Sequence, residues 1–178
     1  MMTETSRQFD QAIALCKDMF VNKMMDYGSS WRILRTPSLT DQIYIKANRI
    51  RSIEQKGIQK IAEGIRPEFI GIVNYSVIAL IQLGLGSDGE LELDKDEAII
   101  LYDKHISSAR ELMEDKNHDY DEAWRNMRIS SLTDIILMKL RRIKQIEDRE
   151  GETLVSEGVD ANYRDIINYA LFALIKLE

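Results

Sequence analysis

The sequence predicts an all-α protein, a helical bundle made of two tandem three-helix repeats related by a pseudo-twofold axis. Apolar residues recur at spacings of three and four along most of the 178 residues, and no stretch alternates convincingly as a strand would. The segment DYGSSWRILRTPSLTD, residues 26–41, returns as DYDEAWRNMRISSLTD, residues 119–134, at an offset of 93 (119 − 26). Half of the positions in 23–54 are identical to those in 116–147. This self-similarity indicates an internal duplication.

The duplication sets the expected domain organisation. IVNYSVIALIQL at 72–83 matches IINYALFALIKL at 166–177 at an offset of 94 (166 − 72). We therefore expect a first helical repeat at residues 1–84, a linker at 85–95 and a second helical repeat at 96–178. Each half is small for an independent domain, so we expect the two to pack as one globular body.

The first helix of each repeat is predicted from an apolar stripe with helical spacing. The stripe of the first repeat should end near Gly28, and its one cysteine is expected in the core. The stripes consist of Phe9, Ile13, Cys16 and Phe20 in the first repeat and Ile99, Tyr102, Ile106, Ala109 and Met113 in the second.

The second and third helices are predicted from capping signals and hydrophobicity. Ser38 followed by Asp41 is typical of a helix start, so Asp41 and its counterpart Asp134 are interpreted as caps. This second helix should run from about residue 39 towards 61. The third should begin at Pro67 and run to residue 83, buried on nearly all sides like its twin at 163–177. Each repeat can also hold a short extra turn.

The net charge and its distribution along the chain limit the classes of ligand that the protein can be expected to bind. The net charge of −6 argues against a protein that coats nucleic acid, and an apolar run long enough to span a bilayer is not expected. We therefore expect a soluble, cytoplasmic protein. Residues 23–60 carry eight basic and three acidic side chains, and residues 116–149 carry eight and six. Positive charge concentrated in the duplicated part favours a local phosphate site over a long polyanion.

Polar residues interrupt apolar helix faces at equivalent places in both repeats. Lys46 and Lys139 fall within isoleucine and leucine stripes, and Asn74 and Asn168 interrupt the most apolar stretches. The lysines could form structural ion pairs or extend to the rim, and the asparagines could fix helix register. Alternatively they line a polar pocket, where Arg49 and Arg142, one turn from the lysines, would help bind an anion.

The connection between the first and second helices combines aromatic and basic residues in each repeat. Rings can stack on a planar base and guanidinium groups can bind phosphate bidentately. The competing interpretation is that the rings close the end of the bundle while the arginines pair with surface acids. The residues are Tyr27, Trp31, Arg32 and Arg35, repeated as Tyr120, Trp124, Arg125 and Arg128.

The pattern K..DYG.SWR..R..SLTD.I..K..RI..IE, followed by NYS..ALI, resembles a bacterial and phage family first catalogued as a domain of unknown function and then as the first nucleotide modification associated domain. That family is in turn similar to the all-helical MazG-like and dUTPase-like nucleoside triphosphate pyrophosphohydrolases. The resemblance implies a nucleotide site in a helical bundle, with Mg held by acidic helix faces. It places Lys46, Arg49 and Glu54 on the second helix and Asn74, Asp165 and Asn168 on the third.

One departure from the wider group concerns the metal. The Glu-Glu-x-x-Glu motif that holds Mg there is absent from the second helix, where Lys46 and Arg49 stand instead. We expect Glu147 or Asp165 to help place Mg if the ion binds. Because the first repeat has Gly71 at the position of Asp165, the second repeat is the better candidate for chemistry.

The sequence thus favours a helical protein that binds a nucleotide or nucleoside phosphate. If the protein is an enzyme, the expected reaction is the release of pyrophosphate from a nucleoside triphosphate. The alternative is a non-catalytic protein-interaction module, and a homo-oligomer is compatible with either. The candidate phosphate-binding residues are Lys23, Arg32, Arg35, Lys46, Arg49, Lys116, Arg125, Arg128, Lys139 and Arg142. The candidate pocket residues are Tyr27, Trp31, Asn74, Tyr120, Trp124 and Asn168.

Overall fold

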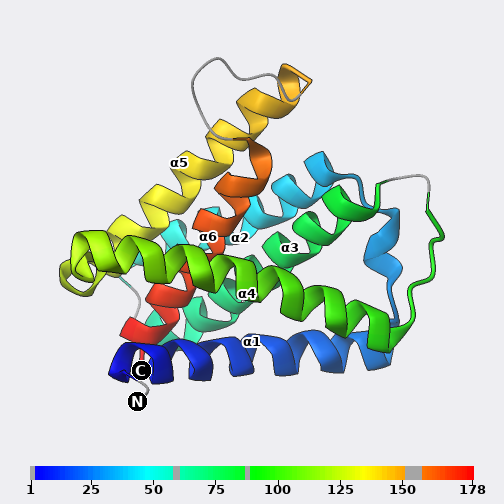
Figure 1. The fold of residues 1–178 in the computed structure, drawn as a ribbon. Helices are drawn as coiled ribbons and strands as arrows, with labels where there is room; N and C mark the ends of the chain where they lie inside the picture. The colour runs from blue at the N-terminus through cyan, green and yellow to red at the C-terminus, as the bar shows by residue number, and fades with distance from the viewer. Residues whose placement is uncertain (1–2, 58–60, 87–88, 151–157) are drawn as a thin grey trace.

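A computed structural model describes residues 3–57, 61–86, 89–150 and 158–178, with the backbone alone for 61–63. Its described part is helical and contains no strand, which confirms the all-α prediction (Figure 1). The elements are α1 (Glu4–Tyr27), η1 (Ser30–Ile33), α2 (Thr36–Lys56), α3 (Ile61–Leu85), α4 (Lys95–Tyr120), η2 (Ala123–Asn126), α5 (Ile129–Asp148) and α6 (Val159–Lys176). The order of elements in the first repeat returns in the second, and η1 and η2 are the extra turns.

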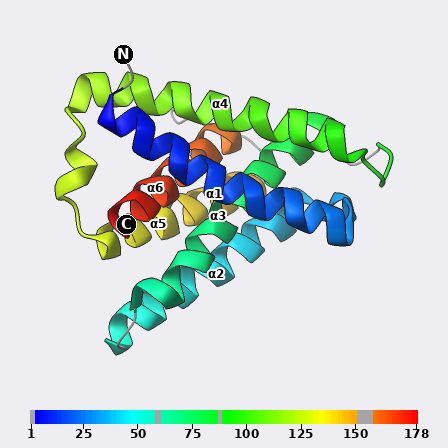
Figure 2. The same ribbon diagram turned by 90° about the horizontal axis from the view of Figure 1, so that it is seen from below.

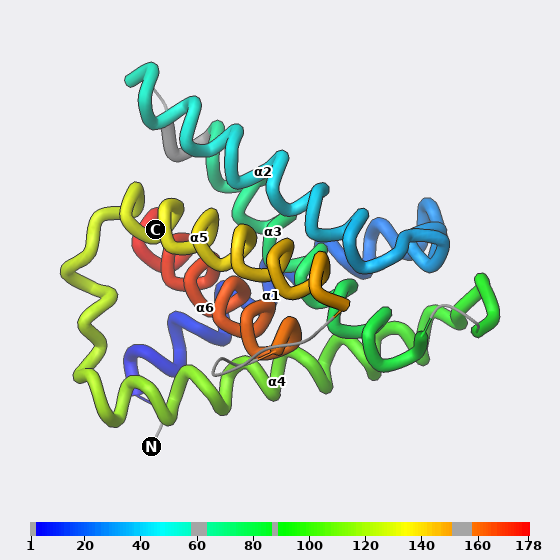
Figure 3. The backbone as a smooth tube through the Cα atoms, turned by 90° about the horizontal axis from the view of Figure 1, so that it is seen from above, coloured from blue at the N-terminus to red at the C-terminus, as the bar shows by residue number. Residues whose placement is uncertain are grey.

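The helices form three layers. The two most apolar helices, α3 and α6, pack against each other in the middle. Helices α2 and α5 cover them on one side, as Figure 3 shows, and α1 and α4 cover them on the other, as Figure 2 shows. Each outer layer pairs equivalent helices of the two repeats, and this arrangement is the pseudo-twofold relation that the duplication predicts.

Three helix starts differ from the sequence prediction: those of α2, α3 and α6, the last of which begins at Val159 and not at residue 163. Helix α2 begins at Thr36, with Pro37 in its first turn, and Ser38 is not the N-cap. Asp41 and Asp134 are not caps either: they form ion pairs across the repeats, with Lys144 at 3.1 Å and with Arg51 at 4.0 Å. These pairs join α2 to α5.

Helix α3 begins at Ile61, and Pro67 lies inside it. The prediction of a start at Pro67 was wrong because a proline one or two turns into a helix removes a hydrogen bond without ending the helix when neighbouring helices pack against it. Within α3, residues Gly64–Leu85 are long and apolar enough to cross a membrane, contrary to the sequence expectation, but 67% of the 18-residue apolar window in this segment is buried inside the fold. Burial by other helices is the property of a core helix.

Candidate functional site

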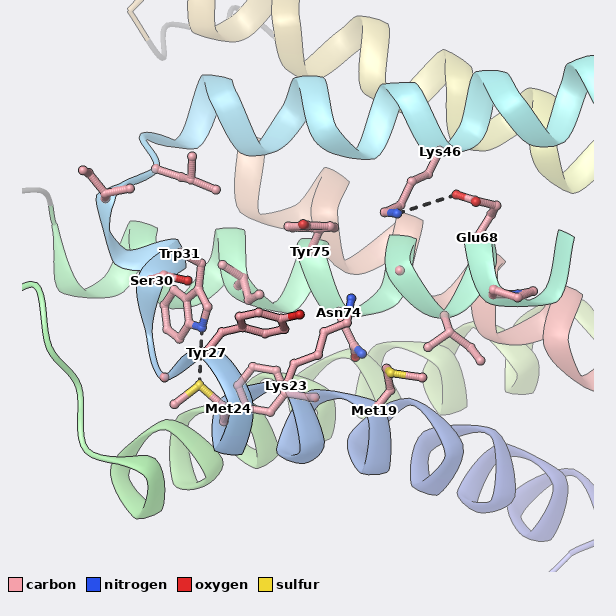
Figure 4. Close-up of a pocket in the computed structure, with 18 of the residues that line it drawn as sticks. Met19, Lys23, Met24, Tyr27, Ser30, Trp31, Lys46, Glu68, Asn74 and Tyr75 are labelled. Carbon is pink, nitrogen blue, oxygen red and sulfur yellow. Dashed lines mark hydrogen bonds and ion pairs between the residues drawn. The ribbon is translucent and has the colours of Figure 1, made fainter. Parts of the chain in front are cut away.

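The first repeat contains a cavity of about 670 Å³ between α1 and α2, with α3 as its floor (Figure 4). Lys23 and Tyr27 enter it from α1, and Lys46 enters from α2. The size lies within the range of small-molecule sites in proteins, about 300–1,000 Å³. The lining combines aromatic rings, methionines and a few charged groups. Its members include Lys23, Met24, Tyr27, Trp31, Lys46, Arg66, Glu68, Gly71, Asn74, Tyr75 and Ile78.

Three aromatic rings line the cavity. Trp31 is half-buried, and its indole N–H donates to the Met24 sulfur at 3.4 Å, which fixes the orientation of the ring. Tyr27 lies at the mouth, 72% exposed, and Tyr75 comes from α3. Rings that are held in place but not fully covered can stack on a planar ligand without a large conformational cost.

Two lysines and one carboxylate also line the cavity. The Lys46 ammonium lies 3.6 Å from a carboxylate oxygen of Glu68 and 5.6 Å from the centre of the Tyr75 ring. Glu68 has a second, closer partner in Arg49, at 2.8 Å. Lys23, by contrast, forms no ion pair with any residue in the described ranges. The cavity therefore contains one lysine that shares its carboxylate and one without a counter-ion.

Both polar atoms of the Asn74 side chain, at the floor of the cavity, have a hydrogen-bond partner. Its amide N–H donates to the carbonyl of Cys16 at 2.9 Å, and its oxygen accepts from the Tyr102 hydroxyl at 2.7 Å. Asn168 makes the equivalent bond to the carbonyl of Ala109 at 2.9 Å. The two asparagines thus fix α3 against α1 and α6 against α4, which supports the register interpretation of these residues.

In the second repeat the corresponding space is filled. The buried Asp165 carboxylate lies between two lysines, 2.8 Å from Lys116 and 2.9 Å from Lys139. Trp124 is buried and stacked on Phe172, with ring centres 4.3 Å apart and planes at 4°. The sequence favoured the second repeat for chemistry because of Asp165. The structure instead places the open cavity in the first repeat and uses Asp165 to neutralise lysines.

The loop arginines lie outside the cavity lining. Arg32 is buried and ties the inter-repeat linker down by donating to the carbonyls of Glu90 at 3.1 Å and Gly86 at 3.3 Å. Arg125 lies over the Trp124 ring and donates to Thr5 and Gln8, both at 2.7 Å. Arg125 also pairs with the Glu122 carboxylate at 3.1 Å, as the competing interpretation expects, whereas Arg32 contacts backbone carbonyls and not a surface acid in the described part of the chain.

Three further arginines and the exposed tyrosine of the second repeat are also placed away from the cavity. Arg35 and Arg128 are exposed residues immediately before α2 and α5. Arg142 contacts Gln145 at 3.5 Å on its own helix. Tyr120 is 71% exposed at the end of α4.

The two candidate metal ligands do not form one site. Asp165 is held by two ammonium groups, which repel a cation. Glu147 lies eight residues beyond Lys139 on α5, about 12 Å along the helix axis, and accepts from Thr40 of α2 at 3.2 Å. The described residues contain no cluster of three or more His, Cys, Asp or Glu that could hold a metal. The residues present therefore do not fit Mg at Asp165.

Glu147 and its counterpart Glu54 instead belong to the α2–α5 interface. Thr133 donates to Glu54 at 3.4 Å, the mirror image of the Thr40–Glu147 bond. Burial raises the pKa of both carboxyl groups, and the threonine hydrogen bonds oppose the rise in pKa. The reciprocal bonds connect the repeats at two equivalent places.

Comparison with known proteins assigns the chain to a family. Residues 23–83 and 116–177 each match the family described as nucleotide modification associated domain 1. The chain belongs to this family. The two matched segments are the two copies of the domain, and the cavity residues from Lys23 to Ile78 lie in the first copy. No curated protein and no solved structure matches the chain.

Several important residues were missed in the sequence. Glu68 carries the ion pairs of the cavity, and Phe172 stacks on Trp124 in the second repeat. The aligned repeats contained a signal, because both positions differ between the copies: Glu68 aligns with Asn162, and Phe172 aligns with Ile78. The sequence prediction used only the difference between Gly71 and Asp165.

Proposed function

We propose that this protein, one of a family associated with nucleotide modification, binds a nucleotide or nucleoside phosphate in the cavity of its first repeat. The observation that carries the proposal is the joint presence of aromatic rings and two lysines in a single cavity of about 670 Å³. Trp31, Tyr27 and Tyr75 offer surfaces for a base, while Lys23 and Lys46 offer charge for phosphate.

The electrostatics of the cavity favour an anionic ligand. Lys23 has no carboxylate partner among the described residues, and Lys46 can leave Glu68 because Arg49 remains 2.8 Å from that carboxylate. A phosphate that approaches both ammonium groups therefore forms charged hydrogen bonds without leaving Glu68 unpaired.

The proposal concerns binding and does not extend to pyrophosphate release. Hydrolysis of a triphosphate normally uses bound cations to neutralise the phosphates, and Asp165 is occupied by lysines in the second repeat. The cavity of the first repeat has one lining carboxylate, Glu68, which already has two basic partners.

Calorimetry with a panel of nucleosides and nucleoside mono-, di- and triphosphates tests the proposal. We expect a phosphate-bearing member to bind, and Lys23→Met to weaken it about tenfold or more, since a charged hydrogen bond contributes about 1.5–3 kcal/mol. Lys116→Met is the matched control, because Lys116 is the equivalent lysine in the filled repeat and should leave affinity unchanged.

No binding across the whole panel would overturn the proposal and favour the alternative, a non-catalytic interaction module. Equal losses in Lys23→Met and Lys116→Met would also contradict it, because they would show a general effect on the fold. Circular dichroism on each variant confirms that the helices are intact before affinity is compared.

A further inference from the structure

The two copies of the domain have the same basic and aromatic residues at equivalent positions. These residues surround a cavity in the first copy and the side chains of Asp165 and Phe172 in the second. Lys23 and Lys46 correspond to Lys116 and Lys139, and Trp31 corresponds to Trp124. Within this shared frame the α6 residues Asp165 and Phe172 replace the α3 residues Gly71 and Ile78.

The side chains that differ occupy the positions where a ligand would bind. The Asp165 carboxylate bridges the two lysines of its repeat through its two oxygens, at 2.8 and 2.9 Å. The Phe172 ring stacks flat on Trp124. The two residues are seven apart on one helix, so they lie on the same face about 10 Å apart along its axis. Together they present an anion and a planar ring.

In the first repeat neither group is present, and the Lys46 side chain lies over the place of the missing carboxylate. A Cβ built on Gly71 would lie 2.7 Å from the Lys46 side chain, so the stem of Lys46 covers the glycine directly. Both Gly71 and Ile78 line the cavity, together with Trp31 and the two lysines. The flexible end of Lys46 can swing away to meet an anion, as Lys139 meets Asp165.

Building on the proposed nucleotide binding, we infer that the ligand is a nucleoside monophosphate whose single phosphate lies between Lys23 and Lys46 above Gly71, with its base against Trp31. The phosphate takes the place of the Asp165 carboxylate, and the base takes the place of the Phe172 ring. The second repeat is a copy of the site that is filled by its own side chains, so one ligand binds per chain.

Charge in the cavity selects the monophosphate. Its phosphate carries at most two negative charges. Lys23 and Lys46 balance these charges, while Arg49 remains paired with the Glu68 carboxylate. The remaining basic lining residue, Arg66, is engaged with Glu178 at 2.8 Å and with the Leu177 carbonyl at 3.1 Å. A triphosphate brings more negative charge than these lysines neutralise, and Glu68 would repel it.

Substitutions that exchange the differing residues test the inference. Gly71→Asp places a carboxylate between Lys23 and Lys46 and should weaken binding of the best nucleoside monophosphate by more than about tenfold. It should also raise the melting temperature above that of Gly71→Asn, a control that adds almost the same volume without the charge. Retained affinity in Gly71→Asp, or equal melting temperatures for the two variants, would overturn the inference.

The converse experiment opens the second repeat. Calorimetry should give one monophosphate per wild-type chain and two per chain for Asp165→Gly combined with Phe172→Ile. A stoichiometry of one in a folded double variant contradicts the inference. If the double variant does not fold, the comparison of Gly71→Asp with Gly71→Asn tests the inference by itself, because both variants leave the second repeat unchanged.

Failure of the inference is distinguishable from failure of nucleotide binding. A wild-type protein that binds triphosphate more tightly than monophosphate overturns the ligand class and leaves nucleotide binding intact. A wild-type protein that binds no member of the panel overturns both.

Discussion

The first and second repeats differ in how they use the same set of polar residues. In the first, Lys23 and Lys46 line an open cavity and Trp31 is half-buried at its wall. In the second, the equivalent lysines hold the buried Asp165 and the equivalent tryptophan is buried. A lysine on an apolar helix face thus lines a cavity in one copy and neutralises a buried carboxylate in the other.

The contrast predicts that equivalent substitutions in the two repeats have unequal effects, and the largest difference is expected at the tryptophans. Trp124→Ala removes a buried ring stacked on Phe172 and should lower the free energy of unfolding by about 3–5 kcal/mol. Trp31→Ala should lower it by clearly less and should instead abolish nucleotide binding. Urea denaturation and calorimetry measure both; equal losses of stability would remove the distinction between the repeats.

The second comparison concerns the helix lysines. Lys139→Met leaves the buried Asp165 with Lys116 alone and should lower the free energy of unfolding by about 2 kcal/mol. Lys46→Met should cost less than about 1 kcal/mol, because Glu68 keeps Arg49. Denaturant titration of the two variants decides the order, and a greater loss for Lys46→Met would be contrary evidence.

A smaller effect on stability is expected from adding, at the equivalent position of the first helix, the tyrosine hydroxyl that Tyr102 supplies. The Asn168 side-chain oxygen is buried and has no hydrogen-bond partner among the described residues, whereas the equivalent oxygen of Asn74 accepts from Tyr102. Phe9 stands at the position equivalent to Tyr102 (102 − 93), so Phe9→Tyr should supply the missing donor and stabilise the fold by about 1 kcal/mol. The reverse change, Tyr102→Phe, should destabilise it, and thermal unfolding of both variants tests the pair.

The smallest effect is expected on the pH dependence of stability, from Glu54 and Glu147, the equivalent carboxyl groups at the α2–α5 interface. Burial raises the pKa of Glu54 and Glu147, so their stabilising contribution is present in acid and is lost as pH rises through the folded-state pKa. A Glu54→Gln, Glu147→Gln double variant keeps the acceptors for both threonines. Its stability relative to wild type should therefore increase between pH 4 and pH 7.

Denaturation at several pH values measures this difference. Glu111→Gln, at an exposed position of α4, is the control and should follow wild type throughout. A pH-independent difference for the double variant would show that the interface does not depend on the charge state of these carboxyl groups.

The sequence predicted the architecture well because its evidence is local or repeated. Helical spacing of apolar residues depends on 3.6 residues per turn, and duplication fixes which helices are equivalent. The start of α3 was wrong because the favourable position of proline in a first turn is only a preference, which packing in the middle layer overrides. The cap at Ser38 was wrong because Thr36 and Pro37 already begin α2.

The candidate site was predicted only in part. Lys23, Trp31 and Lys46 do meet in one cavity, but Arg32 and Arg125 face the linker and the end of α1. A helical wheel places a residue on one face of its own helix, and it carries no information on which neighbour that face meets. Partners such as Thr40 and Glu147 lie 107 residues apart, so only the packing of α2 on α5 brings them together.

The sequence by itself determined the helical fold, the duplication and the recurrence of lysine and asparagine within apolar faces, because periodicity and self-similarity are properties of the chain alone. Only the tertiary structure decided which repeat is open. The side chains at two equivalent positions make the difference: Asp165 and Phe172 occupy the space between three helices in the second repeat, whereas Gly71 and Ile78 leave a cavity in the first. Whether a side chain fills such a space is defined only once the helices have packed.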